Sequence, residues 1–162
     1  MSGTKGLSTL SSLAAFFVIL LASSGSSASD HLRKSSGQTV YAPVYSHIYV
    51  GAQGQEFQLA ATLSVRNTSM LKPISLDYVG YYDSSGKMLR NMITTPLQIE
   101  PLGSTQYFIG ESDTAGGFGA FFLVKWSADA RVNEPVIEVV SAGTRSGQGI
   151  SFVSSGKVLD SN

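Results

Sequence analysis

The chain contains no cysteine, only two histidines and few charged residues, and each shortage excludes a class of protein. Without cysteine there are no disulfides, no zinc site of the usual kind and no acylated residue of a lipid-anchored lipoprotein. Charged residues make up 14% of the sequence, so uncharged polar residues must cover much of the surface. This composition favours a small β protein outside the cell over a charge-rich cytosolic helix bundle.

Catalytic and nucleic-acid-binding patterns are also missing. Most acid-base mechanisms near neutral pH use histidine, and of His31 and His47 only His47 lies in a patterned segment. No G-x-S-x-G motif presents a serine nucleophile to it. The basic residues are scattered singly and form no stripe that would track a phosphate backbone. We therefore expect no enzyme, no cofactor and no nucleic-acid partner.

The sequence also has no apolar run long enough to span a bilayer. The run Leu13–Ala22 has ten residues, where a spanning helix needs about 20. Lys5 precedes it and small residues follow, which predicts a secretory signal peptide over residues 1–28 with cleavage before Ser29. An uncleaved membrane anchor is the alternative. We expect an exported bacterial protein, periplasmic or extracellular, with no transmembrane span after cleavage.

The remaining sequence reads as short strands joined by turns. Residues 29–38 are polar and without period, which predicts a flexible leader. From residue 39, apolar and polar residues alternate with period two, most clearly over 56–68, and Pro43 indicates an edge strand or a bulge in the segment 39–50. Eight or nine such segments predict an all-β fold: one antiparallel β-sandwich over residues 39–160, immunoglobulin-like or fibronectin type III-like. Trp126 is expected to anchor its core.

Two groups of side chains are candidates for ligand binding. The first lies in "GESDTAGGFGA", residues 110–120, where Glu111 and Asp113, with Glu134 as a third oxygen ligand, would suit a cation such as calcium. The spacing does not fit an EF-hand, and the same segment predicts a structural corner with Asp113 in an Asx turn. The second group is Tyr45, His47 and Tyr49 on one strand face, either exposed for binding or packed as core.

Several segments carry a resemblance to a known family: "VYSHIYVG", "LAATLSVRNT", "YYDSSGKML", "PLQIEPLGST", "ESDTAGGFGAFFLVKW" and "GTRSGQGISFVSSGKV". Over residues 39–158 the chain resembles the bacterial family called domain of unknown function 3124. The shorter runs "RNT" and "IEPLGST" are also similar to the β-sandwich of late-embryogenesis-abundant type proteins. The first resemblance implies an exported bacterial protein of this architecture and supplies no catalytic residue.

These observations favour an exported, non-catalytic binding or adaptor module whose partner is an unidentified protein or envelope component. A strand edge or a loop end would provide the contact. The alternative is a small-ligand or divalent-cation module centred on Glu111 and Asp113, and an enzyme of unknown class ranks third. No metal is expected, and these two carboxylates would hold one if any residues did.

Overall fold

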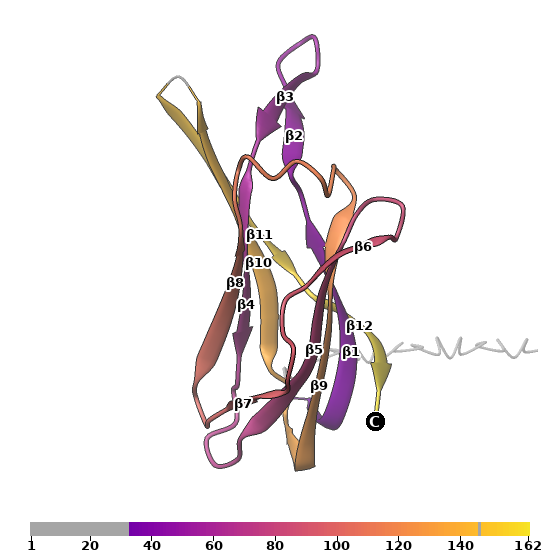
Figure 1. Ribbon diagram of the computed structural model, residues 1–162. Coiled ribbons are helices and arrows are strands. Elements are labelled where there is room, and N and C mark those ends of the chain that lie inside the picture. The colour runs from indigo at the N-terminus through magenta and orange to yellow at the C-terminus, as the bar shows by residue number, and fades with distance from the viewer. Residues whose placement is uncertain (1–32, 146) are drawn as a thin grey trace, which may run out of the picture. The chain divides into compact units, whose positions relative to one another are not determined.

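The computed structural model describes residues 33–145 and 147–162 (Figure 1). The predicted signal peptide, residues 1–28, and the start of the predicted leader lie outside the described residues. Within the described part every regular element is a β-strand, and the antiparallel sheets pack together, which confirms the all-β antiparallel sandwich. No helix among the described residues is long and apolar enough to cross a membrane.

The larger sheet has six strands and places the longest one at its centre. Its strand order is β12-β1-β9-β5-β6, and β7 pairs with the start of β5. The strands are β1 (Lys34–Val44), β5 (Ile74–Tyr82), β6 (Met88–Asn91), β7 (Leu97–Ile99), β9 (Ala120–Asn133) and β12 (Lys157–Ser161). Because β9 lies between β1 and β5, the segment around Trp126 is the central strand that its apolar sequence predicts.

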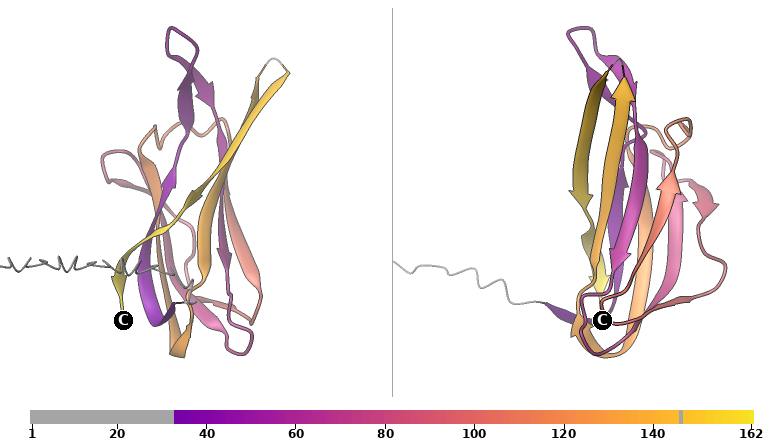
Figure 2. Two further views of the ribbon diagram at one scale, coloured as in Figure 1. Left: turned by 180° about the vertical axis from the view of Figure 1, so that it is seen from behind. Right: turned by 90° about the vertical axis from the view of Figure 1, so that its left-hand side faces the viewer.

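The second sheet has four strands in the order β11-β10-β4-β8, and it forms the other layer (Figure 2). Its strands are β4 (Ala60–Arg66), β8 (Ser104–Ile109), β10 (Val136–Arg145) and β11 (Gln148–Ser155). A separate hairpin, β2 (His47–Val50) and β3 (Gln55–Gln58), extends beyond both sheets. We call this end of the sandwich, with the loop 110–119, the hairpin end, and the opposite end, with the turns 67–73 and 100–103, the loop end.

Alternating side chains of both sheets meet in one hydrophobic core. Val40, Leu63 and Val124 are each at most 3% exposed, and they come from three different strands. Trp126 is 2% exposed and its indole nitrogen Nε1 donates to Gln38 Oε1 at 3.2 Å, so the predicted core anchor is confirmed. All residues of the described core cluster lie between Val40 and Val139. A chain that begins at Ser29 therefore keeps that whole core.

The start of the domain differs from its prediction. Strand β1 begins at Lys34, and Ser35 and Gln38 are buried, so residues 34–38 belong to the sheet and the predicted flexible leader is wrong there. Polar residues are accommodated because their side chains find partners: Ser35 Oγ donates to the Gly37 carbonyl at 2.8 Å. Alternating hydrophobicity could not reveal a strand whose buried positions carry serine, glycine and glutamine.

The structure divides three segments that the sequence pattern joins, the third at Gly156 between β11 and β12, so the described residues form 12 strands, more than the eight or nine predicted. Segment 39–50 breaks at Tyr45 and Ser46, and segment 56–68 breaks at Leu59. The Leu59 amide donates to the Ser46 carbonyl at 2.9 Å. The two segments therefore pair with each other at the point where the β2–β3 hairpin leaves the sheets. Pro43 pairs with Phe121 of β9 but has no partner in β12, which suits a residue without an N–H.

Candidate binding site

The glycine-rich loop at the hairpin end is a corner held by its own backbone. Asp113 Oδ1 accepts a hydrogen bond from the Ala115 amide at 3.3 Å, the Asx turn that the sequence predicts. Gly117 has φ +74°, a left-handed conformation that favours glycine. Gly116 is buried against the Tyr81 hydroxyl, where a Cβ would collide with the ring. The loop geometry therefore needs glycine at both positions.

The three carboxylates of the cation hypothesis are not brought together. Asp113 Oδ2 pairs with Arg90 Nη2 at 2.7 Å, so both oxygens of Asp113 already have partners. Glu134 follows the last residue of β9, and Asp113 precedes its first residue. The 14 residues of β9 span about 45 Å, which places Glu134 at the loop end. Within residues 33–145 and 147–162 no group of three His, Cys, Asp or Glu is placed to hold a metal ion.

The second group of predicted residues does converge, and it gains two members. Tyr45, His47 and Tyr49 gather around Phe118 of the glycine-rich loop, with ring-centroid distances to Phe118 of 5.2, 6.1 and 6.0 Å. Tyr45 also meets Phe152 of β11 at 5.5 Å. We call these five residues the aromatic cluster: Tyr45, His47, Tyr49, Phe118 and Phe152. Tyr49 and Phe118 lie nearly parallel, at 29°, and are 58% and 48% exposed.

Strand register places the polar members of the site beside this cluster. In the β2–β3 hairpin, His47 lies opposite Gln58 and Tyr49 opposite Glu56, so all four side chains share one face. His47 Nε2 is 3.8 Å from Glu56 Oε1, beyond hydrogen-bonding distance. The opposite face of the hairpin carries Phe57, which is buried. The hairpin is thus fixed by one face and presents the other.

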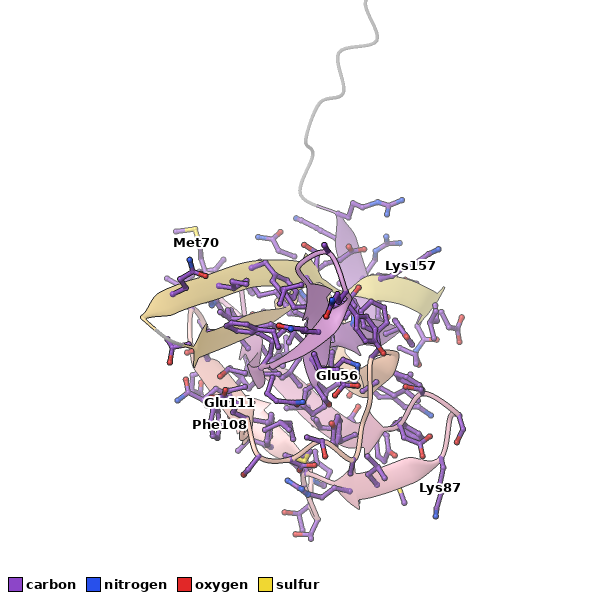
Figure 3. The ribbon with its side chains drawn as sticks, turned by 90° about the horizontal axis from the view of Figure 1, so that it is seen from above. Glu56, Met70, Lys87, Phe108, Glu111 and Lys157 are labelled. Carbon is purple, nitrogen blue, oxygen red and sulfur yellow. The ribbon has the colours of Figure 1, made fainter. Side chains whose placement is uncertain are left out.

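A shallow depression adjoins the hairpin and brings in Glu111. It has a volume of about 430 Å³ and is lined by Glu56, Phe57, Gln58, Glu111 and Thr144. Figure 3 shows Glu56 near the middle of the hairpin end with Glu111 to one side. Glu111 therefore belongs with the hairpin residues, and the site combines two exposed aromatic rings with two carboxylates, an amide and a hydroxyl.

Buried polar atoms without partners also gather at the hairpin end. Ser46 Oγ, His47 Nε2, Gln58 Oε1 and Tyr81 Oη are buried, and none of them makes a hydrogen bond within the described structure. Burial raises the pKa of Tyr81, and the charge of Asp113 raises it further, while Ser46, Arg90 and the Gly116 backbone lower it. The Ser46 and Tyr81 hydroxyls are close neighbours, but their geometry falls short of a hydrogen bond. Buried polar atoms without a hydrogen-bond partner are uncommon in protein cores.

Comparison with known proteins gives the chain a family. The sequence profile of a family described as "Protein of unknown function (DUF3124)" matches residues 37–159, which include the hairpin, the glycine-rich loop, the strands β2 to β11 in full and most of β1 and β12. The chain belongs to the DUF3124 family. The predicted resemblance is therefore confirmed, and the aromatic cluster and the depression of this DUF3124 protein both lie inside the family domain.

Two further comparisons add little to the DUF3124 assignment. No curated protein matches the sequence. A solved structure, the crystal structure of Thermotoga maritima 1070, is similar in part, with a TM-score of 0.46 and 10% sequence identity. It covers 77% of this chain and 97% of its own.

Sequence reasoning missed Phe118 and Phe152 as members of the site. The sequence pattern does not connect either residue with Tyr49, because Phe152 lies in another strand and Phe118 lies more than sixty residues after Tyr49. One signal was available for Phe118: it is a large aromatic residue between Gly117 and Gly119, in a loop otherwise made of small and polar residues. Packing in the core does not explain why Phe118 is aromatic, because 48% of its side chain is exposed.

Proposed function

We propose that this protein is an exported, non-catalytic binding module that recognises a carbohydrate component of the cell envelope at the hairpin end. The observation that carries the proposal is the near-parallel pair of exposed rings, Tyr49 and Phe118, beside the carboxylates of Glu56 and Glu111. Aromatic faces pack against the C–H faces of sugar rings, and carboxylates and amides accept or donate to sugar hydroxyls. The same mixture is typical of small-molecule sites with few placed polar groups.

The non-catalytic part of the proposal rests on the surroundings of His47. Its ring lies against Tyr49 and Phe118, and its nearest charged group is Glu56 at 3.8 Å. His47 Nε2 has no hydrogen-bond partner among the described residues, so no hydroxyl nucleophile is paired with that nitrogen. The proposed role of His47 is to support Tyr49 and to add a polar edge to the site.

The test compares the chain from Ser29 onward with its Tyr49→Ala/Phe118→Ala variant on purified envelope polysaccharide. Wild type should co-sediment with the polysaccharide, and the variant should bind at least about tenfold more weakly because both stacking faces are lost. Leu159→Ala is the matched control, since Leu159 is 57% exposed but lies in β12, which pairs with residues 38–41 of β1 and not with the hairpin. It should bind like wild type.

Two results would contradict the proposal. Release of reducing ends by wild type, abolished in His47→Ala, would establish an enzyme. Absence of polysaccharide binding, with a protein crosslinked by wild type and lost in the Tyr49→Ala/Phe118→Ala variant, would keep the surface but replace the carbohydrate with a protein partner.

A further inference from the structure

The loop end carries the most exposed aliphatic side chains of the described chain. Met70 is 74% exposed and Leu71, its neighbour, is 85% exposed. Leu102 of the turn 100–103 is 67% exposed, and its amide donates to the Ser69 carbonyl at 3.1 Å, so the two turns are adjacent. Met70 projects away from the ribbon (Figure 3). Three large apolar side chains thus stand in water at one end of the sandwich, which calls for a partner surface.

The turn that carries Met70 and Leu71 is held rigidly by a buried asparagine. Asn67 is 2% exposed, and its Nδ2 donates to the carbonyls of Lys72, Ile99 and Glu100 at 2.9, 3.1 and 3.1 Å. Asn67 Oδ1 accepts from the Ser69 amide at 2.9 Å. Both turns are therefore hydrogen-bonded to one side chain, and this ordered backbone holds Met70 and Leu71 in solvent.

Further bonds fix the same turn from its two sides. Ser69 Oγ accepts from the Lys72 amide at 3.0 Å, and Thr68 Oγ1 donates to the Glu134 carbonyl at 2.8 Å. Leu102 has φ +60°, a conformation that a leucine adopts only when its surroundings impose it. A rigid turn loses little conformational entropy when its side chains enter another phase, so this arrangement is suited to insertion.

Basic side chains surround the exposed turn. A groove beside Met70 and Leu71 is lined by Lys34, Lys72 and Arg131 and by no acidic residue. The acidic residues Glu100, Asp129 and Glu134 belong to the same end but do not line this groove. None of the three basic side chains is in a salt bridge with a described residue. Arg131 Nη2 donates to the Lys34 carbonyl at 2.7 Å, and Glu134 lines a neighbouring depression with Arg33, Lys34 and Arg131, which leaves that depression and this groove with more basic than acidic residues. The long stems of the basic side chains can lie along an apolar partner.

The position of the chain's entry into the domain points to a membrane as that partner. Strand β1 begins at Lys34, which lines the groove, and residues 23–33 separate it from the apolar run Leu13–Ala22. In the alternative in which the run is kept as an anchor, eleven residues reach at most about 40 Å, so the bilayer that holds the run is within reach of this end. The tether depends on the uncleaved anchor, whereas the exposed turn and the basic groove are present whether or not residues 1–28 are cleaved.

We propose that the loop end is a membrane-contact surface, in which Met70 and Leu71 insert into the interface of an anionic bilayer and Lys34, Lys72 and Arg131 bind its headgroups. Apolar side chains that enter the interface and cations that meet anionic lipid act together in such binding. The hairpin end is then directed away from the membrane, about the length of β9 from it.

The experiment uses vesicles of phosphatidylglycerol and phosphatidylcholine, and the chain from Ser29 onward, which lacks the apolar run. Wild type should co-sediment with these vesicles, and Met70→Ser/Leu71→Ser should reduce its partitioning by about tenfold or more. Lys34→Gln/Lys72→Gln should reduce it about tenfold on the anionic vesicles and leave any residual binding to pure phosphatidylcholine unchanged. Phe108→Ser removes an apolar side chain of β8 that is 62% exposed and lies far from the loop end, and it should have no effect.

A fluorescence measurement makes the test specific to position. Trp126 is the sole tryptophan and is buried, so its emission should not respond to lipid. Leu71→Trp should gain a blue-shifted emission when anionic vesicles are added, and Phe108→Trp should not. Failure of wild type to bind the vesicles, or an equal response from the tryptophans at 71 and 108, would overturn the proposal. Neither result depends on carbohydrate binding at the hairpin end.

Discussion

The two ends of the sandwich are built on opposite principles. At the hairpin end, buried polar atoms of Ser46, Gln58 and Tyr81 have no partners, and aromatic rings lie partly in solvent. At the loop end, one buried side chain, Asn67, makes four hydrogen bonds and leaves aliphatic side chains exposed. The hairpin end offers a small ligand its exposed rings and the polar groups of the depression, whereas the loop end offers apolar surface and charge.

The sharpest way to break this comparison is to remove Asn67. Asn67→Ala leaves three carbonyls and an amide at the loop end without their partner, so it should lower the free energy of unfolding by about 3 kcal/mol. Chemical denaturation measures the loss. Asn133→Ala removes one bond, to the Thr68 carbonyl at 3.3 Å, and should cost less than about 1 kcal/mol. Equal losses in the two variants would mean that Asn67 does not hold the loop end.

A smaller effect is expected at the corner of the hairpin end. Gly116→Ala places a Cβ against the Tyr81 hydroxyl and should destabilise by about 2 kcal/mol, measured by thermal denaturation. Gly110→Ala is the control, because its Cβ would meet only ordinary contacts, the nearest at 3.7 Å. Tyr81→Phe removes an unpaired buried hydroxyl, so it should cost nothing alone and recover part of the Gly116→Ala loss. No recovery in the double variant would rule out this collision as the cause.

The smallest effect concerns Arg90 and Asp113, whose side chains are 50% and 23% exposed. A double-mutant cycle with Arg90→Ala and Asp113→Ala should give a coupling of about 0.5 to 1 kcal/mol, because solvent screens the pair, and added salt should reduce it.

Calcium at millimolar concentration should leave the melting temperature of the protein unchanged. A calcium-induced rise that Asp113→Asn abolishes would restore the cation hypothesis for the hairpin end.

The fold could be predicted where the hydrophobic pattern of a segment is plain. The segment 120–128 is apolar on both faces at its start, and the structure makes it part of the central strand β9. Prediction failed at residues 34–38, where the buried positions are polar, and at Leu59, where only a bond to Ser46 interrupts a regular pattern. The local hydrophobic pattern indicates which face of a strand is buried, but it does not indicate which distant segment of the chain pairs with that strand.

Only the part of the candidate site that lies within one local segment could be predicted. Tyr45, His47 and Tyr49 share a local segment, so their association was visible, whereas Phe118 joins them only through folding. Asn67 shows the reverse case. Asn67-Thr68-Ser69 matches a glycosylation acceptor pattern in the sequence, but the Asn67 amide is buried and bonded to three carbonyls. Its role is to hold the loop end.

The sequence by itself determined that this is a cysteine-free, all-β chain with a glycine-rich corner, because composition, period-two alternation and turn residues are local properties. Its match to a family profile made it a member of the DUF3124 family. Only the tertiary structure decided that Glu111 and Glu134 lie at opposite ends and that Phe118 meets Tyr49. It also decided that Met70 and Leu71 stay in solvent. Each of these depends on pairing between strands far apart in the chain, and strand pairing is fixed by the whole core rather than by any one segment.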